Sequence, residues 1–515
     1  MPEKRTKMWQ SAEEQSKAVS AAVEGEIPPW IKGTYLRVGP GKFDFENFSL
    51  NHWFDGYAIV SRFDIQESKI QLTTKFLESD AYKRACTANK PVVCEFGTKA
   101  HAEPGKSLLS RIVSSIIPEF SDNANINLFN IGKETFITGE TCFFRNLYPE
   151  KLLSSEKHDT YKTFGLNVCS AHPLTDTDGT TYNIGTSVLT GLKYHIVRIP
   201  PHKNAKDSLK KSKLIATIPS RWNTLFSYNH SFGMTQNYFI FIEQPFVLNA
   251  TKLMSFGLSR GQNQCFSEWL EWKPELGNRF YVIEKATGKL IKTEFMSDIP
   301  FFFLHYINCY EENGQVVLQL SIFDSPEVLF SQYLERLRRN ASEDDSIRAY
   351  GVKFVIPVNN VETEGEELVT IGNTTASASR QGKTVILKPE IVTGKGLELP
   401  AVNESFKRKK NRYYWASGLT SETEFRNCIC KVDTETKETK LWRKDAQVFG
   451  EPVYIPRPGS TKEDDGVLMV PMTDTRDQYP DCLYFLEADT MELMGKASFP
   501  IRVPPSIHGL FIEGS

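Results

Sequence analysis

Residues 312–323 read Glu-Asn-Gly-Gln-Val-Val-Leu-Gln-Leu-Ser-Ile-Phe. The Asn-Gly pair favours a tight hairpin turn, and it leads into a run of β-branched and other apolar side chains that is typical of a buried strand. Similar runs occur in Tyr238-Phe-Ile-Phe-Ile-Glu and Gly466-Val-Leu-Met-Val-Pro-Met, with turn signals such as Asp176-Thr-Asp-Gly between runs. Many short strands with long interruptions predict an all-β protein, either a propeller or a pair of sandwiches.

Helix-like patterns are few along the chain. We expect short helices over residues 12–23, 107–117, 250–258 and 327–339. In the last of these segments, apolar residues from Val328 to Leu337 recur with a helical period. Because all-β propellers often run long as one unit, we expect a single domain over residues 1–515.

Composition excludes several classes of protein. The net charge of −2 gives no electrostatic reason to expect a nucleic acid as partner. The nine cysteines are scattered and odd in number, which argues against a disulfide framework and favours a reducing compartment. The first residues carry charges throughout, unlike a secretory signal, and no apolar stretch of about 18 residues is present. These features predict a cytoplasmic protein.

Four of the nine histidines stand apart. Five lie in polar or turn-like contexts, whereas His172, His230, His305 and His508 are embedded among apolar or small residues. Burying an imidazole in such surroundings costs free energy unless a hydrogen bond or a metal satisfies its nitrogens. Each of the four, taken alone, is explained as well by a core histidine bonded to a main-chain carbonyl.

The spacing of these histidines favours a joint explanation. They are separated by 58, 75 and 203 residues, and a propeller blade with long loops takes roughly 65–75 residues, so the chain has room for about seven blades. The innermost strands of a propeller line its central channel, so equivalent positions on four blades converge on the axis. The sequence therefore predicts a four-histidine metal site.

The type of ligand narrows the choice of metal. Four neutral nitrogen donors lack the thiolate that is common in structural zinc sites, and they favour an octahedral first-row ion such as Fe(II). Histidine ligands usually donate their second N–H to a carboxylate or a carbonyl. Three glutamates in apolar, strand-like contexts fit that role, namely Glu140, Glu398 and Glu451, although each is explained as well by an exposed turn.

Further motifs accompany these residues. They include Gly25-Glu-Ile-Pro-Pro-Trp, Arg37-Val-Gly-Pro-Gly, Asn51-His-Trp-Phe-Asp-Gly, Glu95-Phe-Gly-Thr and Glu463-Asp-Asp-Gly-Val. In this order the chain resembles the animal carotenoid cleavage oxygenases over nearly its full length. The resemblance implies a seven-bladed β-propeller with a helical dome over the metal face. It also implies Fe(II) bound by the four histidines named above, with the three glutamates behind them, and His52 outside the ligand set.

Within that family, the chain is most similar to the insect carotenoid isomerooxygenase branch. The similarity rests on Arg260-Gly-Gln-Asn, Ser220-Arg-Trp and Leu304-His-Tyr-Ile-Asn-Cys. It implies cleavage by O2 of the central 15,15′ double bond of a carotenoid such as β-carotene or zeaxanthin, coupled to trans-to-11-cis isomerisation of one half. Off-centre cleavage at the 9′,10′ bond, retinyl-ester isomerohydrolysis and a non-enzymatic scaffold are the alternatives. Residues 301–303, all phenylalanine, are candidate walls of the substrate tunnel, with alternate ones expected to point away into the packing of the blade.

A carotenoid is insoluble in water, so we expect reversible contact with a membrane surface. The apolar residues within 107–117 would form one face of a helix, flanked by Lys106 and Arg111, and residues 253–258 could join the same patch. An ordinary core helix is the alternative. Animal relatives carry Pro-Asp-Pro-Cys before this segment, whereas this chain has Ala102-Glu-Pro-Gly105 and lacks the cysteine that could carry a lipid.

Overall fold

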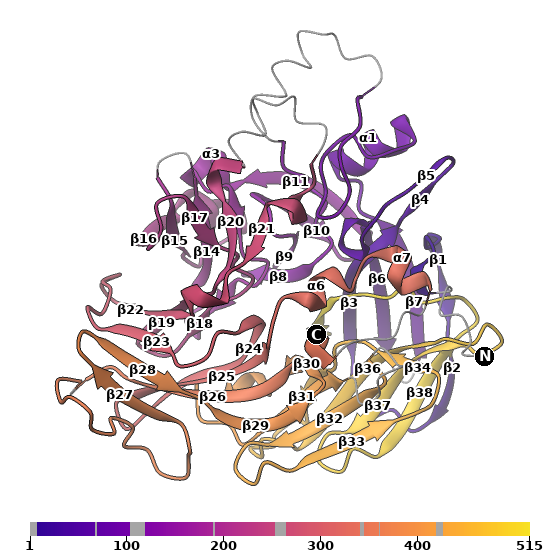
Figure 1. Ribbon diagram of the computed structural model, residues 1–515. Coiled ribbons are helices and arrows are strands. Elements are labelled where there is room, and N and C mark those ends of the chain that lie inside the picture. Colours follow the sequence, from indigo (N-terminus) through magenta and orange to yellow (C-terminus); the bar gives the residue numbers. More distant parts are fainter. Residues whose placement is uncertain are drawn as a thin grey trace.

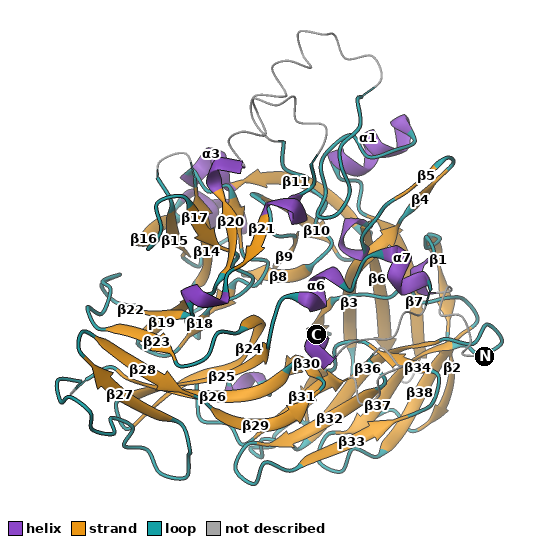
Figure 2. Cartoon of the chain, in the orientation of Figure 1, coloured by secondary structure: helices purple, strands orange, loops and turns teal. Residues whose placement is uncertain are grey.

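Sheets arranged in a ring dominate the molecule. The computed structural model describes residues 8–66, 69–103, 119–188, 191–252, 264–339, 345–359, 361–418 and 426–514. Figure 1 shows the sheets following one another around a common centre, and Figure 2 shows how few helices accompany them. Within the described residues, seven of the sheets have four to six strands each. The fold is therefore the seven-bladed propeller that the sequence predicts.

The first three blades are formed by the N-terminal part of the chain and by its last strand. Strands are given in sheet order, with the innermost strand last. Blade 1 contains β1 (Gln15–Ser20), β7 (Lys69–Phe76), β6 (Tyr57–Gln66), β3 (Gly33–Lys42) and β39 (His508–Glu513). Blade 2 contains β11 (Leu153–Asp159), β10 (Phe143–Tyr148), β9 (Glu134–Thr138) and β8 (Asn127–Ile131). Blade 3 contains β16 (Lys213–Pro219), β15 (Lys193–Ile199), β14 (Thr181–Ser187) and β12 (Val168–Cys169), with β13 (Leu174–Thr175) beside β14.

The remaining four blades are formed mainly by later parts of the chain, except that β27 and β28 of blade 4 follow β26 of blade 5 and that β2 of blade 7 is N-terminal. Blade 4 contains β27 (Ser377–Gln381), β28 (Thr384–Lys388), β23 (Glu294–Ser297), β22 (Arg279–Glu284), β19 (Tyr238–Glu243) and β18 (Gly233–Met234). Blade 5 contains β29 (Glu390–Lys395), β26 (Tyr350–Pro357), β25 (Gln315–Phe323) and β24 (Phe302–Glu312). Blade 6 contains β33 (Thr439–Arg443), β32 (Cys428–Asp433), β31 (Tyr413–Gly418) and β30 (Leu397–Ala401). Blade 7 contains β2 (Ala22–Gly25), β38 (Leu493–Phe499), β37 (Asp481–Glu487), β36 (Gly466–Asp474) and β34 (Gln447–Phe449), with β35 (Val453–Pro456) beside β36.

Strands from opposite ends of the chain close the ring. The C-terminal β39 pairs antiparallel with β3 in blade 1, and the N-terminal β2 pairs antiparallel with β38 in blade 7. Between blades, apolar side chains form the core: Ile240 and Val282 of blade 4 pack in one buried cluster with Leu320 and Val352 of blade 5. This closure fixes β39, and the residue that begins it, at the innermost position of blade 1.

Short helices and loops form the cap. The α-helices are α1 (Asp80–Ala88), α3 (Thr160–Phe164), α4 (Ala205–Lys210), α6 (Glu327–Phe330) and α7 (Leu334–Arg338). The 3-10 helices are η2 (Trp53–Asp55), η3 (Phe266–Trp269), η4 (Pro274–Leu276), η5 (Asp345–Ile347) and η6 (Glu404–Phe406). The small sheets β4 (Asp44–Phe45) with β5 (Phe48–Ser49), and β17 (Leu225–Ser227) with β20 (Phe246–Asn249) and β21 (Leu270–Trp272), complete the elements. Residues of η2, η3 and α6 line the cavity described below, so the cap lies over the propeller axis.

The expected helix over residues 12–23 is wrong. These residues form β1 and β2, which pair at the outer edges of blades 1 and 7. Their polar and alanine-rich sequence has no apolar alternation, because the side chains of an edge strand are largely exposed and the main chain supplies the pairing. Tertiary hydrogen bonding thus outweighs local helix propensity here.

The helix expected over residues 327–339 is broken into α6 and α7. Between them, the carbonyl of Gln332 accepts a hydrogen bond from Trp53 N at 3.0 Å, and Leu334 N donates to Asn51 O at 2.8 Å. These main-chain hydrogen bonds with residues 51–53 hold the segment against the start of η2. The segment consequently leaves the helical path in the middle.

Two sequence expectations cannot be placed. Residues 107–117 and 253–258, which were expected to meet a membrane, lie outside the described residues. In the part of the chain that the structure describes, no helix has the length and apolar character needed to cross a membrane.

Candidate metal centre

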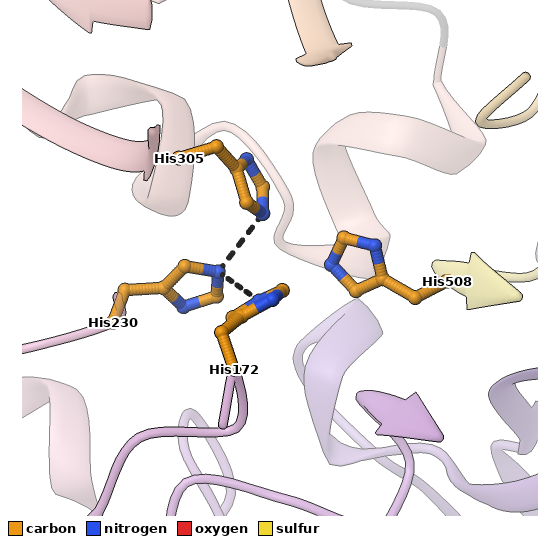
Figure 3. A group of neighbouring side chains, drawn as sticks. All are labelled: His172, His230, His305 and His508. Carbon is orange, nitrogen blue, oxygen red and sulfur yellow. Dashed lines mark hydrogen bonds between the residues drawn. The ribbon is translucent and has the colours of Figure 1, made fainter. Parts of the chain in front are cut away.

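The four singled-out histidines meet at the centre of the ring. His172 lies between β12 and β13, His230 between β17 and β18, His305 on β24, and His508 at the start of β39. One ring nitrogen from each lies within 4.8 Å of the others, and Figure 3 shows the imidazoles directed toward a common point. Residues as far apart as 172 and 508 in sequence are therefore neighbours because their blades share an axis.

Three carboxylates face the outer nitrogens of three of these rings. The Nδ1 atom of His230 contacts Glu140, that of His305 lies 2.8 Å from Glu398, and that of His508 lies 2.8 Å from Glu451. An ionised carboxylate only accepts hydrogen bonds, so each Nδ1 carries the proton. In the neutral form of each of these rings, Nε2 carries no proton and its lone pair faces the shared centre.

The ring nitrogens at this centre are arranged to bind a cation. His230 Nε2 lies 2.9 Å from His172 Nε2 and 3.1 Å from His305 Nε2 (Figure 3). The Nε2 atom of His508 is buried and has no hydrogen-bond partner within the described residues. Converging lone pairs repel one another unless a positive ion lies between them, and an unpaired buried acceptor costs free energy. The four imidazoles fit a divalent first-row metal ion, and no thiolate accompanies them in the cluster.

Burial and neighbouring charges keep the site in the form that binds a metal. Burial lowers the pKa of His172 well below its usual value, and the other three rings reinforce this; burial also lowers the pKa of His508. Burial alone would raise the pKa of the Glu398 and Glu451 carboxyl groups. The neighbouring histidine, His305 beside Glu398 and His508 beside Glu451, has the opposite effect, and the pKa of each carboxyl group lies below its usual value. His172 and His508 are therefore neutral, and Glu398 and Glu451 are ionised, near neutral pH.

All seven blades contribute to this centre. Blades 1, 3, 4 and 5 supply the histidines, whereas Glu140 follows β9 of blade 2, Glu398 lies on β30 of blade 6 and Glu451 follows β34 of blade 7. The blades that supply no histidine thus supply the carboxylates. The four histidines and the three glutamates can therefore meet only when all seven blades are closed into one propeller.

Local structure aims these side chains. The register of β24 against β25 shifts between Phe303 and Tyr306, and such a bulge re-aims the side chain within it, here His305. Next to His172, the Ser170 hydroxyl accepts a hydrogen bond from His172 N at 2.9 Å and donates one to His230 O at 2.5 Å. One serine therefore fixes the loops that carry two of the histidines.

Three supporting residues were not assigned a role from the sequence. Asn127 Nδ2 lies 3.3 Å from His172 Nδ1, the one ring of the four without a carboxylate partner among the described residues, and donates to Ala171 O at 2.8 Å. Tyr228 donates to Glu140 at 2.7 Å. Arg37 lies behind Glu451, with Nη1 3.7 Å from a carboxylate oxygen. Arg37 belongs to a quoted motif, but nothing in the local sequence of Asn127 or Tyr228 reveals the contact.

One sequence expectation about the surroundings is wrong. Phe301, Phe302 and Phe303 do not line the cavity beside the histidines; they are at most 1% exposed and pack between strands. His52 and His195, which lie in polar or turn-like sequence contexts, are also buried. Each is satisfied away from the centre, His52 by Leu329 O at 2.7 Å and His195 by Ser187 and Thr217 hydroxyls.

A largely apolar cavity of about 210 Å³ opens onto the centre. His230, His305 and His508 are in its wall. The remainder of the wall is rich in aromatic and aliphatic side chains from the cap and the inner strands, among them Phe54, Phe96, Phe266, Trp269, Phe323 and Leu329. Such a space binds a long apolar molecule through buried area, at about 0.8 kcal/mol per CH₂, and excludes water from the histidines.

Acid should destabilise the metal-free protein through this cluster. The pKa of His172 and that of His508 are lowered on folding, so the stability that their neutral rings contribute is present above pH 6.5 and is lost as the pH falls below it. Each ring contributes a slope of up to about 1.4 kcal/mol per pH unit. We expect the Tm of the metal-free protein to fall between pH 7.5 and 5.5. The decrease in Tm should be smaller in His172→Asn. If scanning fluorimetry gave the same dependence of Tm on pH for this variant and the wild type, His172 would not be a source of the acid sensitivity.

The propeller and its centre together define a class: seven-bladed propellers with four converging histidines and three carboxylates beside an apolar cavity. The family model described as retinal pigment epithelial membrane protein matches residues 8–513. The mitochondrial carotenoid-cleaving dioxygenase of Mustela putorius furo is 35% identical over 98% of this chain and 95% of its own length. The human β,β-carotene 15,15′-dioxygenase is 34% identical over 97% of this chain and 93% of its own. The chain therefore belongs to the carotenoid cleavage dioxygenase family.

Solved structures agree with the fold. The Synechocystis apocarotenoid oxygenase Trp149Ala mutant has a TM-score of 0.76 at 22% identity, covering 99% of this chain and 98% of that chain. A cobalt-substituted form of the same enzyme has a TM-score of 0.77 at 21% identity, with the same coverage. The two animal relatives match this chain about equally well, and neither distinguishes an insect branch from the others.

Proposed function

We propose that the protein is an Fe(II)-dependent oxygenase that cleaves the central 15,15′ double bond of a carotenoid with O2. The products are two retinoid aldehydes, and cleavage is coupled to isomerisation of one half to the 11-cis form. The observation that carries the proposal is the convergence of one ring nitrogen from each of four histidines beside an apolar cavity. The relative named for 15,15′ cleavage supports the choice of bond.

In this proposal His172, His230, His305 and His508 bind the iron, and Glu140, Glu398 and Glu451 orient three of the rings. Fe(II) held by four imidazoles would supply O2 activation, with coordination positions left open for small ligands. The carboxylates fix the tautomer of each ring and raise its basicity. The apolar wall binds the polyene by area alone, because a hydrocarbon chain offers no charged group, and the position of the wall relative to the histidines selects the bond.

The isomerisation is supported by the resemblance to the insect branch. Of the motifs that carry it, Ser220-Arg-Trp is structural: Arg221 Nε lies 2.9 Å from the buried carboxylate of Glu243, and Arg221 does not line the cavity. Leu304 and His305, from the third motif, do line it. The residues that would set the geometry of the product are therefore to be found near Leu304.

One experiment tests the reaction. Iron-loaded protein is incubated aerobically with zeaxanthin or β-carotene, with oxygen uptake and isomer-resolved chromatography as readouts. We expect O2 consumption and two C20 aldehydes, one of them 11-cis. Apocarotenals and ionones would establish 9′,10′ cleavage instead, and conversion of retinyl esters without O2 uptake would establish an isomerohydrolase. Purified protein that takes up no iron would overturn the catalytic role.

We also propose reversible attachment to a membrane surface through residues 107–117 and 253–258. The support is compositional: apolar residues in these segments are flanked by basic ones, and the substrate is insoluble in water. The double variant Ile112→Asp/Ile116→Asp should reduce co-sedimentation with anionic phospholipid vesicles several-fold. A matched control is Ile391→Asp, since Ile391 is an exposed apolar residue (62%) on β29 and its replacement should leave partitioning unchanged. Equal partitioning of the double variant and the wild type would remove these segments from the proposal.

A further inference from the structure

Two polar side chains project into the cavity wall where α6 packs against η5. Gln332 follows α6 and Arg348 follows η5, and both line the cavity together with Val328, Leu329 and Ile347. Gln332 is 5% exposed, and the Arg348 side chain is 13% exposed. An amide and a guanidinium are therefore buried against a surface that is otherwise suited to a hydrocarbon.

Both side chains have hydrogen-bonding capacity that the described residues do not use. The Nε and Nη2 atoms of Arg348 and the Oε1 atom of Gln332 are buried without a partner. The remaining contacts are weak: Arg348 Nη1 lies 3.8 Å from the exposed Asp345, and Gln332 Nε2 lies 3.2 Å from the Ser331 hydroxyl. Buried polar atoms are nearly always satisfied, so unpaired ones in a ligand cavity indicate a polar group on the ligand.

Three other polar residues of the same wall, Glu95, Asn123 and Asn125, already have partners in the protein. Glu95 accepts a hydrogen bond from Ser121 at 2.7 Å, and Asn123 and Asn125 donate to main-chain carbonyls of residues 54–56. These groups maintain the wall and have little capacity left for a ligand. The guanidinium and the amide oxygen, in contrast, are one donor and one acceptor left open at the junction of α6 and η5.

We propose that Arg348 and Gln332 determine substrate specificity by binding a hydroxyl group on the terminal ring of the carotenoid. This inference rests on the proposed function and adds the substrate class. A hydroxyl is both acceptor and donor: its oxygen accepts from the Arg348 guanidinium, and its hydrogen is donated to Gln332 Oε1. A hydrocarbon ring leaves both groups unpaired and desolvated. A site that hydrogen-bonds a substrate hydroxyl rejects the analogue that lacks it.

The test compares zeaxanthin with β-carotene, which differ only in ring hydroxyls. The wild-type protein should show kcat/KM at least about tenfold higher for zeaxanthin, the discrimination expected from one satisfied buried hydrogen bond. Arg348→Met keeps the length of the side chain and removes its donors. It should lower kcat/KM for zeaxanthin about tenfold and leave that for β-carotene within about twofold; Gln332→Met should act in the same direction. Arg336→Met, at an exposed position on α7, is the control and should change neither.

Binding to the iron-free protein gives a second readout, because the wall contains Trp53 and Trp269, whose fluorescence a bound polyene quenches. Zeaxanthin should bind more tightly than β-carotene, and the difference should vanish in Arg348→Met. Equal wild-type kcat/KM for the two carotenoids, or an equal loss on both in Arg348→Met, would overturn the inference while leaving the proposed function intact. Cleavage of neither carotenoid by the iron-loaded wild type would instead sink the proposed function.

Discussion

His230→Ala is expected to abolish both iron binding and carotenoid cleavage while leaving the propeller folded. His230 is the ring whose Nε2 lies between those of His172 and His305, at 2.9 Å and 3.1 Å, so its loss removes the central donor of the cluster. It also leaves the carboxylate of Glu140 facing a cavity in place of a ring N–H. Iron per protein by elemental analysis should fall to background, and product formation from zeaxanthin should fall below detection.

The control for this variant is a second buried histidine of the same molecule. His195 is 8% exposed on β15, and its ring contacts the hydroxyls of Ser187 and Thr217 and no other histidine. His195→Ala should retain iron and activity. Glu451→Gln should be intermediate, with a loss of about 10- to 100-fold, because it perturbs the orientation and basicity of His508 without removing a donor. Full activity in His230→Ala would make the ligand assignment wrong.

The propeller could be predicted because its inner strands appear as apolar runs in the sequence, and because the histidines are separated by intervals that match the length of a blade. Runs such as 238–243 and 315–323 are recognisable strands, and both are observed as β19 and β25. Edge strands were not recognisable. Residues 15–20 have no apolar alternation, since their pairing to β7 depends on main-chain atoms, which every sequence provides. Hydrophobic periodicity therefore detects inner strands and misses the outermost ones.

The centre was predictable as far as its residues have unusual local contexts. A histidine among apolar neighbours is conspicuous, as His305 is in Phe-Phe-Phe-Leu-His, and three glutamates in strand-like contexts were found to face three of these rings. Asn127 lies in ordinary strand sequence on β8 and Tyr228 directly follows β17, and both touch the centre only through tertiary packing. Triple phenylalanine beside His305 indicated a tunnel wall, but β24 places these rings in the core between blades.

Arg37→Met is expected to cause a large loss of stability and to weaken iron retention as well. The Arg37 side chain is 1% exposed and donates to the Ser506 hydroxyl at 2.7 Å, to Glu451 O at 3.1 Å and to Ile507 O at 3.1 Å. Its charge also faces the Glu451 carboxylate. Removing one partner from a buried ion pair costs about 3–5 kcal/mol, since the remaining charge and carbonyls stay buried without compensation.

The position of Arg37 couples ring closure to the metal centre. Arg37 lies opposite Gly509 in the pairing of β3 with β39, and a Cβ atom at Gly509 would lie 2.7 Å from Arg37 Cδ, so only glycine leaves room for the guanidinium stem. The side chain then holds residues 506–507, immediately before His508, and the glutamate that orients His508. Losing these contacts should release the last strand and the fourth histidine together.

Thermal unfolding and iron content measure the two effects of Arg37→Met. The Tm should fall by several degrees, and dialysis against a chelator should remove iron faster than from the wild type. Arg62→Met is the matched control: Arg62 lies on β6 of the same blade, and its pair with Asp64, at 2.7 Å, is partly exposed and contributes about 0–1 kcal/mol. A variant at position 37 with wild-type Tm and iron retention would show that β39 is held by its main-chain pairing alone, and that the guanidinium does not link closure to the centre.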